Sequence, residues 1–252
     1  MSKEIEKWWD ISSEDYQKSA KVETKSAHYG PYAPNENKLR LLGKVKGKKI
    51  LEIGCGGGQC SIAFAKQGAI CKGLDLSQKQ IDYAKALAKK EKVSVQFLKH
   101  NIQTLKNIKS NSYDIVFSAY ALQYVPNLKK CFNEVYRVLK KKGLFVFSFD
   151  HPFYTLISTE NHKLERNYNT LGKIEEIEPG PDGINRKFIA YFRKISEIIE
   201  AISNSGFILE KMIEPFDKKS EKGWRKGYWK EIYPKNLVEK ISPTIIFKAR
   251  KK

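Results

Sequence analysis

The chain has 252 residues, a formal net charge of +19 and a pI near 9.6, and 41% of its residues are apolar. This composition supports a substantial core and excludes an intrinsically disordered chain. No apolar run approaches the roughly 18 residues that span a bilayer, and the charged N-terminus has no secretory signal core, so we expect a soluble, cytoplasmic protein without a membrane span.

The segment 1–44 is expected to form a cap outside any sheet. Residues 3–20 have the periodicity of an amphipathic helix. A loop with Gly and Pro follows at 26–35, and then a short helix around 36–42. Because this segment carries aromatic side chains that need a surface to cover, we expect it to close over a binding site.

Residues 45–150 alternate short apolar strands with amphipathic helices and should form the core of the fold. The predicted strands cover 49–53, 69–75, 93–98, 113–118 and 144–149. The predicted helices cover 59–66 and 77–90, with a third between Asn127 and Gly143. Ser77 and Gln80 have the spacing of a capping box. This alternation predicts a parallel sheet with helices on both faces.

After Asp150 the alternation is interrupted twice. Residues 151–192 are rich in Asn, Gly, Pro and charge and predict an insertion that carries a hairpin. A second insertion covers 215–242, where aromatic and basic residues interleave in 224–230 and predict packing or a lid. The remaining predicted elements are a helix at 194–204 and strands at 207–213 and 244–250. We expect one domain, 1–252.

A strand that runs directly into a glycine loop is the strongest motif. Residues 50–58 read Ile-Leu-Glu-Ile-Gly-Cys-Gly-Gly-Gly, and a predicted helix follows. Such a loop lets a ligand approach the backbone and the helix N-terminus. Asp75 ends the next strand, 21 residues after Gly54, where a carboxylate accepts both ribose hydroxyls of an adenosine. A dinucleotide loop would need glycine at position 59, which is Gln59, so NAD is disfavoured.

With Glu52 before them, these glycines resemble the E/D-x-G-x-G-x-G motif of class I S-adenosylmethionine (SAM)-dependent methyltransferases. The segments 74–77, 112–119, 122–125 and 137–145 resemble successive motifs of the same family. The resemblance covers about residues 45–150 and is nearest to the small-molecule group that includes quinone-biosynthesis methyltransferases. It implies a three-layer Rossmann-like α/β fold with a seven-stranded, mostly parallel sheet whose last strand is antiparallel, together with the N-terminal helical segment and the insertions.

The resemblance also implies SAM as the cofactor and S-adenosyl-L-homocysteine as the product. The implied cofactor-binding residues are Glu52, Gly54, Cys55, Gly56, Asp75, Leu76, Asn101, Ile102, Ser118 and Ala119. Asp75 would bind the ribose, and Glu52 would hold the loop or the amino group. Asn101 stands where the family usually has Asp, so it either accepts from the adenine amino group without charge assistance or is a turn residue.

Methyl transfer to an acceptor requires a dry site and an aligned nucleophile, and a base only where the acceptor loses a proton. The candidate catalytic residues are His28, Tyr29 and His151. The candidate acceptor-binding residues are Gln123, Tyr124 and Phe153. A histidine near neutrality acts as a base, and the alternative for each candidate is a hydrogen-bonded lining residue. We expect 28–32, 151–154 and the first insertion to build the acceptor pocket.

The leading interpretation is therefore a small-molecule methyltransferase, monomeric or homodimeric. The charge motivates an RNA methyltransferase instead, but 40 of the 47 basic residues are dispersed lysines, and no Asn/Asp-Pro-Pro-Tyr/Phe motif follows the fourth strand. We therefore expect no specific nucleic-acid partner. A non-catalytic SAM-fold binding module is disfavoured by the intact Gly54, Gly56 and Asp75. The four cysteines form no C-x-x-C pair, so no metal site is expected.

Overall fold

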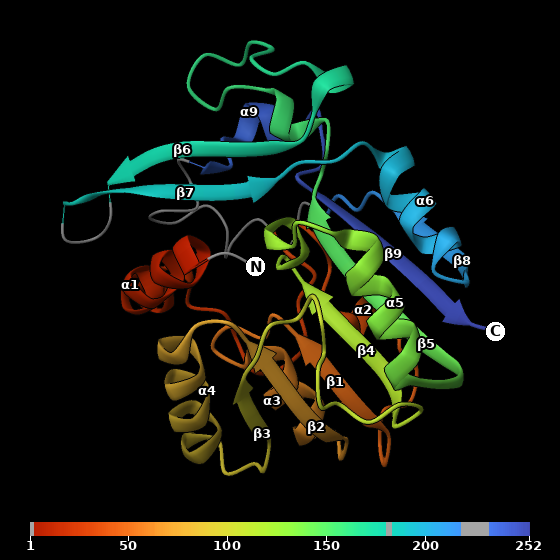
Figure 1. The fold of residues 1–252 in the computed structure, drawn as a ribbon. Coiled ribbons are helices and arrows are strands. Elements are labelled where there is room, and N and C mark those ends of the chain that lie inside the picture. Colours follow the sequence, from red (N-terminus) through yellow and green to blue (C-terminus); the bar gives the residue numbers. More distant parts are fainter. Residues whose placement is uncertain (1–2, 180–182, 218–231) are drawn as a thin grey trace.

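A seven-stranded sheet forms the middle layer of the computed structural model, which describes residues 3–179, 183–217 and 232–252 (Figure 1). Its strands lie in the order β3-β2-β1-β4-β5-β9-β8. They are β1 (Lys49–Ile53), β2 (Ile70–Asp75), β3 (Gln96–Lys99), β4 (Tyr113–Ala119), β5 (Leu139–Asp150), β8 (Phe207–Ile213) and β9 (Thr244–Lys251). The strands β1 to β5 pair in parallel, whereas β9 runs antiparallel to β5 and β8. The predicted Rossmann-like sheet with an antiparallel last strand is confirmed.

Helices cover both faces of this sheet, α3 and α4 on one face and α5 and α6 on the other (Figure 1). The helices are α1 (Lys3–Ala20), α2 (Glu36–Leu39), α3 (Gln59–Lys66), α4 (Gln78–Lys90), α5 (Leu128–Val138), α6 (Ile195–Asn204) and α9 (Lys235–Val238). None of the helices in the described ranges is long and apolar enough to cross a membrane.

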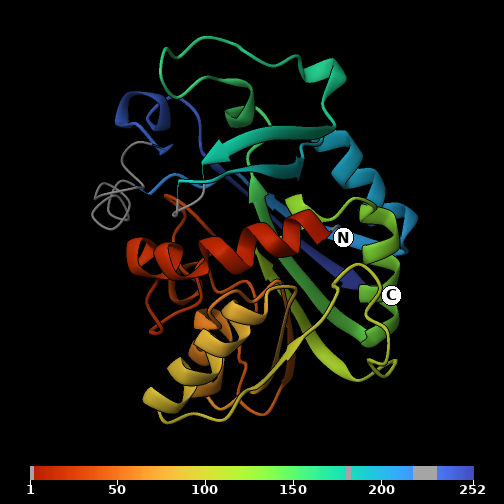
Figure 2. The same ribbon diagram turned by 60° about the vertical axis from the view of Figure 1, so that its left-hand side comes forward.

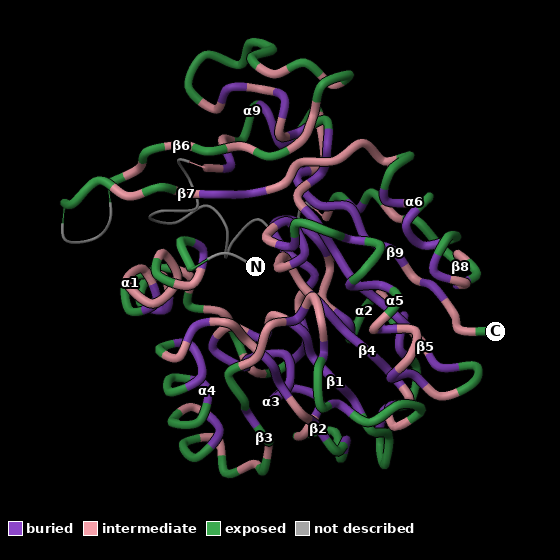
Figure 3. The backbone as a smooth tube through the Cα atoms, viewed as in Figure 1, coloured by how far each residue is buried: buried purple, intermediate pink, exposed green. Residues whose placement is uncertain are grey.

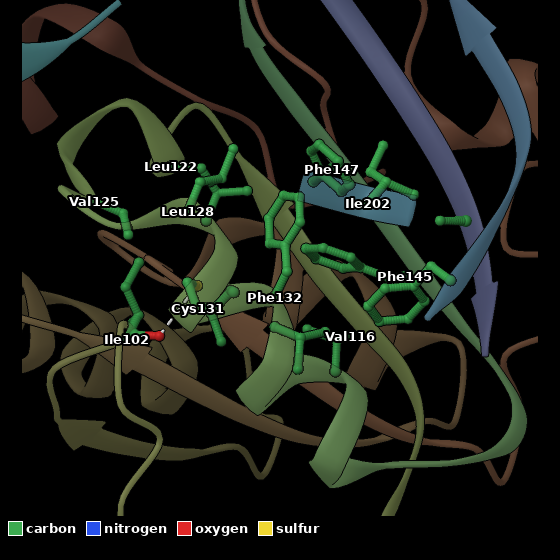
Figure 4. Close-up of a cluster of buried hydrophobic side chains, with 14 of the residues drawn as sticks. Ile102, Val116, Leu122, Val125, Leu128, Cys131, Phe132, Phe145, Phe147 and Ile202 are labelled. Carbon is green, nitrogen blue, oxygen red and sulfur yellow. Dashed lines mark hydrogen bonds between the residues drawn. The ribbon is translucent and has the colours of Figure 1, made fainter. Parts of the chain in front are cut away.

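Side chains that alternate along each strand divide the core into two layers. Leu51 and Ile53 belong to the cluster under α5 and α6, whereas Ile50 belongs to the cluster under α3. Phe132 of α5 lies 5.0 Å from Phe145 and 5.1 Å from Phe147 between ring centroids (Figure 4). Figure 3 shows that the central strands are buried along most of their length. Strands buried on both faces have the nearly continuous apolar sequence that predicted them.

The N-terminal helix α1 lies outside the sheet, between α4 and a β-hairpin (Figure 2). The hairpin is the predicted one and consists of β6 (Lys173–Pro179) and β7 (Asn185–Tyr191). Trp8 meets Phe188 of the hairpin edge-to-face, with 5.4 Å between ring centroids. Asp10 accepts hydrogen bonds from the Ser77 hydroxyl at 2.6 Å and from the Lys79 backbone N–H at 3.2 Å. The cap is thereby attached to α4 below it and to the hairpin above it.

The capping box predicted at the start of α4 forms only in part. The side chains of Ser77 and Asn127 accept from the backbone N–H groups of Gln80 and Lys130. The reciprocal bond, from the Ser77 N–H to the Gln80 side chain, is not formed among the described residues. The side-chain oxygen of Gln80 accepts from Gln17 at 2.8 Å instead. A partner from another element has therefore replaced the local one.

The expectation that Gly143 ends the helix before β5 is wrong. The helix α5 ends at Val138, and Leu139 already pairs with Tyr113 in the sheet. Lys140 binds Asp114 at 2.8 Å, and Arg250 donates to the Lys142 carbonyl at 2.9 Å. These partners lie on β4 and β9, so the local charge pattern, which suits a helix C-terminus, is overridden by contacts across the sheet.

The second insertion is described only at its two ends, and the interleaved segment 224–230 lies outside the described residues. Within the described part, Tyr233 and Leu237 pack against Tyr32 and Tyr154 in a separate apolar cluster. Both insertions and the cap segment therefore meet above the carboxyl ends of the strands.

Gly58, the N-cap of α3, allows a test of the packing around the loop. It has φ +78°, and a Cβ there would lie 2.5 Å from Cζ of Phe97. Gly58→Ala should lower the free energy of unfolding by about 2–4 kcal/mol, because backbone strain and overpacking add. Gly47→Ala is the matched control, since Gly47 has φ +73° and a Cβ there would meet no atom within 4 Å, and it should cost only about 1 kcal/mol. Equal losses in urea unfolding would contradict the packing argument.

Candidate functional site

The glycine loop between β1 and α3 is shaped by hydrogen bonds to the end of β2. The backbone N–H groups of Gly54 and Cys55 both donate to the Leu74 carbonyl, at 2.7 and 2.9 Å. The N–H group of Gly56 donates to Asp75 Oδ2 at 2.8 Å. Gly54 and Gly56 have φ +70° and +49°, values that glycine adopts without strain. Because these N–H groups are already paired, a ligand over the loop would meet its carbonyl groups, of which that of Cys55 already accepts from the Gly58 N–H at 2.8 Å.

A pocket with about 780 Å³ of empty space, part of it open to solvent, lies over this loop. The predicted residues that line it are His28, Glu52, Gly54, Cys55, Gly56, Asp75, Leu76, Ile102, Ala119 and Tyr124. The carboxyl ends of β1, β2 and β4 thus meet at one site, as expected for an open α/β sheet.

Two carboxylates, of buried Glu52 and half-buried Asp75, face this pocket. Glu52 Oε2 accepts from the backbone N–H of Ser61 at 2.8 Å and from its hydroxyl at 2.5 Å, and burial nevertheless raises the pKa of Glu52 to about 8. Asp75 accepts from Gly56 and, at 2.9 Å, from the N–H of Ser77, while burial raises its pKa. A cationic ligand would relieve the cost of ionising such groups.

His28 reaches the pocket as a neutral imidazole. Burial lowers the pKa of His28 to about 4, so the ring is uncharged at neutral pH. Its Nδ1 is buried and has no hydrogen-bond partner among the described residues. A base with this pKa is weaker than the near-neutral histidine that we expected, and the ring is better suited to hold a ligand by a hydrogen bond.

Three of the expected catalytic or acceptor-binding residues lie away from the pocket lining. Tyr29 is fully buried against Phe117, 5.5 Å between ring centroids, and donates to the Glu36 carboxylate. His151 Nε2 lies 2.7 Å from Glu214, and Phe153 stacks between His151 and Tyr168. Tyr29 therefore enters the core, and His151 and Phe153 contact Glu214 and Tyr168 instead of the glycine loop.

Three other expected site residues are engaged by the protein itself. Ser118 donates to the Ile53 carbonyl at 2.8 Å, and Asn101 accepts from the Gln103 N–H at 2.9 Å as a turn residue. Gln123 donates to the Tyr120 carbonyl at 3.0 Å and lines a smaller neighbouring pocket. That pocket also contains Asp150, whose pKa burial raises to about 7. Asp150 was not among the expected site residues, because it lies outside the motifs that singled out Asp75.

The pocket has an aromatic roof that the motifs did not predict. Trp9 meets Tyr16 and Tyr124 edge-to-face at 5.4 and 5.5 Å, and Tyr124 meets Phe188 at 6.1 Å. The cap was expected to close over the site with its aromatic side chains, among them Trp9, which lines the pocket. The lining residues that were not expected are Tyr16, Val22, Gly57, Gln59, Cys60, Gln80, Tyr120 and Ala121. The one available signal was the spacing of Trp9 and Tyr16 along the apolar stripe of the cap helix. Within the described ranges, no group of His, Cys, Asp and Glu side chains could hold a metal ion.

Comparison with known proteins identifies the domain that holds this site. A family model described as a methyltransferase domain matches residues 51–147. An uncharacterized protein of Haemophilus influenzae is 29% identical over 188 residues, which are 70% of this chain and 74% of that protein. A ubiquinone biosynthesis O-methyltransferase of Coxiella burnetii is 32% identical over 121 residues, 46% of this chain, and the match spans 51% of that enzyme's length.

The fold is also shared with a solved structure. The S-adenosylmethionine-dependent methyltransferase of Mesorhizobium loti has a TM-score of 0.62 at 22% identity, over 85% of this chain and 96% of that one. The matched methyltransferase domain begins inside β1 and ends inside β5, and it contains the glycine loop and both pocket carboxylates. Residues 51–147 therefore form a methyltransferase domain of the class I SAM-dependent type, whose cofactor is SAM.

Proposed function

We propose that this protein transfers the methyl group of SAM to a small-molecule acceptor. The observation that carries the proposal is the pocket, with carboxylates at its base and an aromatic roof formed by α1 and Tyr124, against which Phe188 of the hairpin packs. A roof of this kind excludes water from a displacement reaction and leaves room for a small acceptor. Similarity to a ubiquinone biosynthesis O-methyltransferase supports a small acceptor and favours an oxygen nucleophile.

The residues present suit the cofactor. Asp75 would accept the ribose hydroxyls, and Leu76 and Ile102 would pack on the adenine. Glu52 and the carbonyl groups of the glycine loop would hold the amino group, since the loop N–H groups are paired within the protein. The orphaned buried polar atoms His28 Nδ1 and Gln80 Nε2 both belong to residues of the lining, and each would gain a partner from a polar ligand.

On the acceptor side, His28, Tyr124 and Trp9 would position the nucleophile. Bound SAM supplies an electrophilic methyl group on a sulfonium centre. The neutral His28 ring would accept a hydrogen bond from the acceptor and orient its nucleophilic atom, while the aromatic side chains keep water out. Tyr29, His151 and Phe153 would support these segments from behind, because each is packed against other parts of the chain.

The direct test follows the methyl group. The protein is incubated with methyl-labelled SAM and either a small-molecule extract of cells or total RNA. We expect label in the small-molecule fraction, from which the acceptor is identified by mass spectrometry. Label in RNA would support the RNA methyltransferase instead, and SAM binding without transfer to either fraction would support a non-catalytic binding module.

Replacement of Asp75 tests the cofactor site. Asp75→Ala should raise the Kd for SAM about ten- to a hundredfold, because charged hydrogen bonds to the ribose contribute roughly 1.5–3 kcal/mol. Asp82→Ala is the matched control, since Asp82 is an exposed carboxylate on the adjacent helix. Calorimetry that gave the same Kd for Asp75→Ala as for the unmodified protein would remove Asp75 from the site.

Glu52 should couple cofactor binding to pH. The pKa of Glu52 is about 8 in the ligand-free protein, so the group is mostly protonated at pH 7. A cation beside it favours the carboxylate, so binding should release a proton, and SAM affinity should rise as the pH increases from 6 to 8. Calorimetry in buffers of different ionisation enthalpy measures this release. It should disappear in Glu52→Gln, and a release of unchanged size in that variant would assign the proton to another group.

The same raised pKa has a consequence for the ligand-free protein. Between pH 4.5 and about 8 the folded state binds a proton at Glu52 that the unfolded chain does not. The contribution of Glu52 to stability is therefore present at low pH and is lost as the pH rises through this range. Bound SAM should reduce this loss by stabilising the carboxylate.

A further inference from the structure

Three glutamine side chains join the cap helix to the cofactor pocket. Gln59 Nε2 donates to Gln17 Oε1 at 2.6 Å, and Gln17 Nε2 donates to Gln80 Oε1 at 2.8 Å. Gln17 belongs to α1, Gln59 is the first residue of α3, and Gln80 lies in the first turn of α4. All three side chains are buried, at 6%, 6% and 1% exposure. The cap is thus held by directed hydrogen bonds as well as by its aromatic contacts.

The direction of these bonds leaves one donor unused. Gln80 accepts through its oxygen, so its amide nitrogen points elsewhere, and Gln80 Nε2 is buried without a hydrogen-bond partner among the described residues. A buried amide donor that lacks a partner is costly, and native proteins satisfy nearly all such groups. Since Gln80 is part of the pocket lining, a ligand in the pocket is the available partner.

The position of Gln80 indicates which part of the ligand it meets. Its Oε1 atom would lie 3.8 Å from a Cβ on Gly56, and Gly56 donates its N–H to Asp75. The amide therefore lies beside the carboxylate to which the proposed function gives the ribose. A ribose hydroxyl offers Asp75 a donor and offers Gln80 an acceptor oxygen at the same time.

Gly57 provides independent support for the role of the cap. The motif at the loop uses Gly54, Gly56 and Gly58, and its pattern places no demand on position 57. A Cβ on Gly57 would lie 2.5 Å from Gln17 Nε2 and 2.8 Å from its Cδ. The missing side chain at position 57 is therefore what lets the Gln17 amide reach the loop and Gln80.

We propose that Gln80 is a ligand of the cofactor ribose and that Gln17, from the cap helix, is the positioning residue that turns the Gln80 amide toward it. This proposal rests on the proposed SAM site. The N-terminal helix would then contribute to cofactor binding as well as cover the acceptor. Loss of Gln17 should then weaken cofactor binding, because the Gln80 amide would no longer be held in place. Gln17 itself need not contact the cofactor.

The test measures the Kd of S-adenosylhomocysteine by calorimetry for Gln80→Leu, Gln80→Glu and Gln17→Leu. Each variant should raise the Kd about three- to tenfold, which corresponds to the loss of one neutral hydrogen bond. Gln80→Glu preserves shape and still accepts from Gln17, but its carboxylate has no N–H to donate. Gln78→Leu is the matched control on the same helix, because Gln78 binds the exposed Asp82 and is not part of the pocket lining, so this change should leave the Kd unchanged.

A double-mutant cycle separates positioning from simple cap contact. If Gln17 acts through Gln80, Gln17→Leu should have little further effect on the Kd in the Gln80→Leu background. Full additivity would overturn the positioning role. Thermal unfolding without ligand checks that the variants are folded, and Gln17→Glu, which still accepts from Gln59, gives a conservative second variant for the same comparison.

5′-Methylthioadenosine, which has the ribose but not the amino-acid part, tests the assignment to the ribose. Gln80→Leu should raise the Kd of both ligands by the same factor. A loss confined to S-adenosylhomocysteine would place the Gln80 amide on the amino-acid part and overturn the ribose assignment. If Gln80→Leu binds as tightly as the unmodified protein while Asp75→Ala binds weakly, this inference fails alone; if the unmodified protein binds neither ligand, the proposed function fails with it.

Discussion

Two hydrogen bonds from the glycine loop to a single carbonyl hold the site in shape. The N–H groups of Gly54 and Cys55 both reach Leu74, which joins the end of β1 to the end of β2 one residue before Asp75. The loop is thus fixed by the protein and does not need a ligand to order it, which is the preorganisation that tight binding favours. The absent side chain of Gly54 also matters, because a Cβ there would lie 2.1 Å from Cβ of Ala121. The loop and the segment after β4 can approach each other only with glycine at this position.

The cap and the hairpin cover the site that lies at the carboxyl ends of the strands. The carboxyl ends of the strands alone would form an open site with two carboxylates. The contacts of Trp9 with Tyr124, and of Tyr124 with Phe188, cover this site. Aromatic contacts tolerate small shifts, whereas buried amides demand specific partners. The bonds of Gln17 therefore set the position of the cap over the loop, while aromatic contacts hold the cap against Tyr124 and the hairpin.

The molecule as a whole is strongly basic, whereas the base of its pocket is acidic. The chain carries a net charge of +19, yet Glu52 and Asp75 place acidic groups at the base of the pocket. Exposed lysines act through water and are screened beyond about 8–10 Å at physiological ionic strength. A buried carboxylate a few ångströms from the ligand acts through a much lower dielectric. A cationic cofactor is therefore compatible with a strongly basic protein, because the carboxylates in the pocket act on it more strongly than the exposed lysines.

The sequence by itself determined the features that depend on neighbouring residues: the strands and helices, the N-caps, the glycine loop and the carboxylate of Asp75 at the end of β2. Their signals are local, a periodicity, a cap or a positive φ, and a local signal can be read from the chain. Only the tertiary structure decided that His28 faces the pocket while Tyr29 enters the core. It also decided that Gln17 meets Gln80, 63 residues away. Such pairings depend on the path of loops and on the packing of separate elements, and no spacing within one segment encodes them.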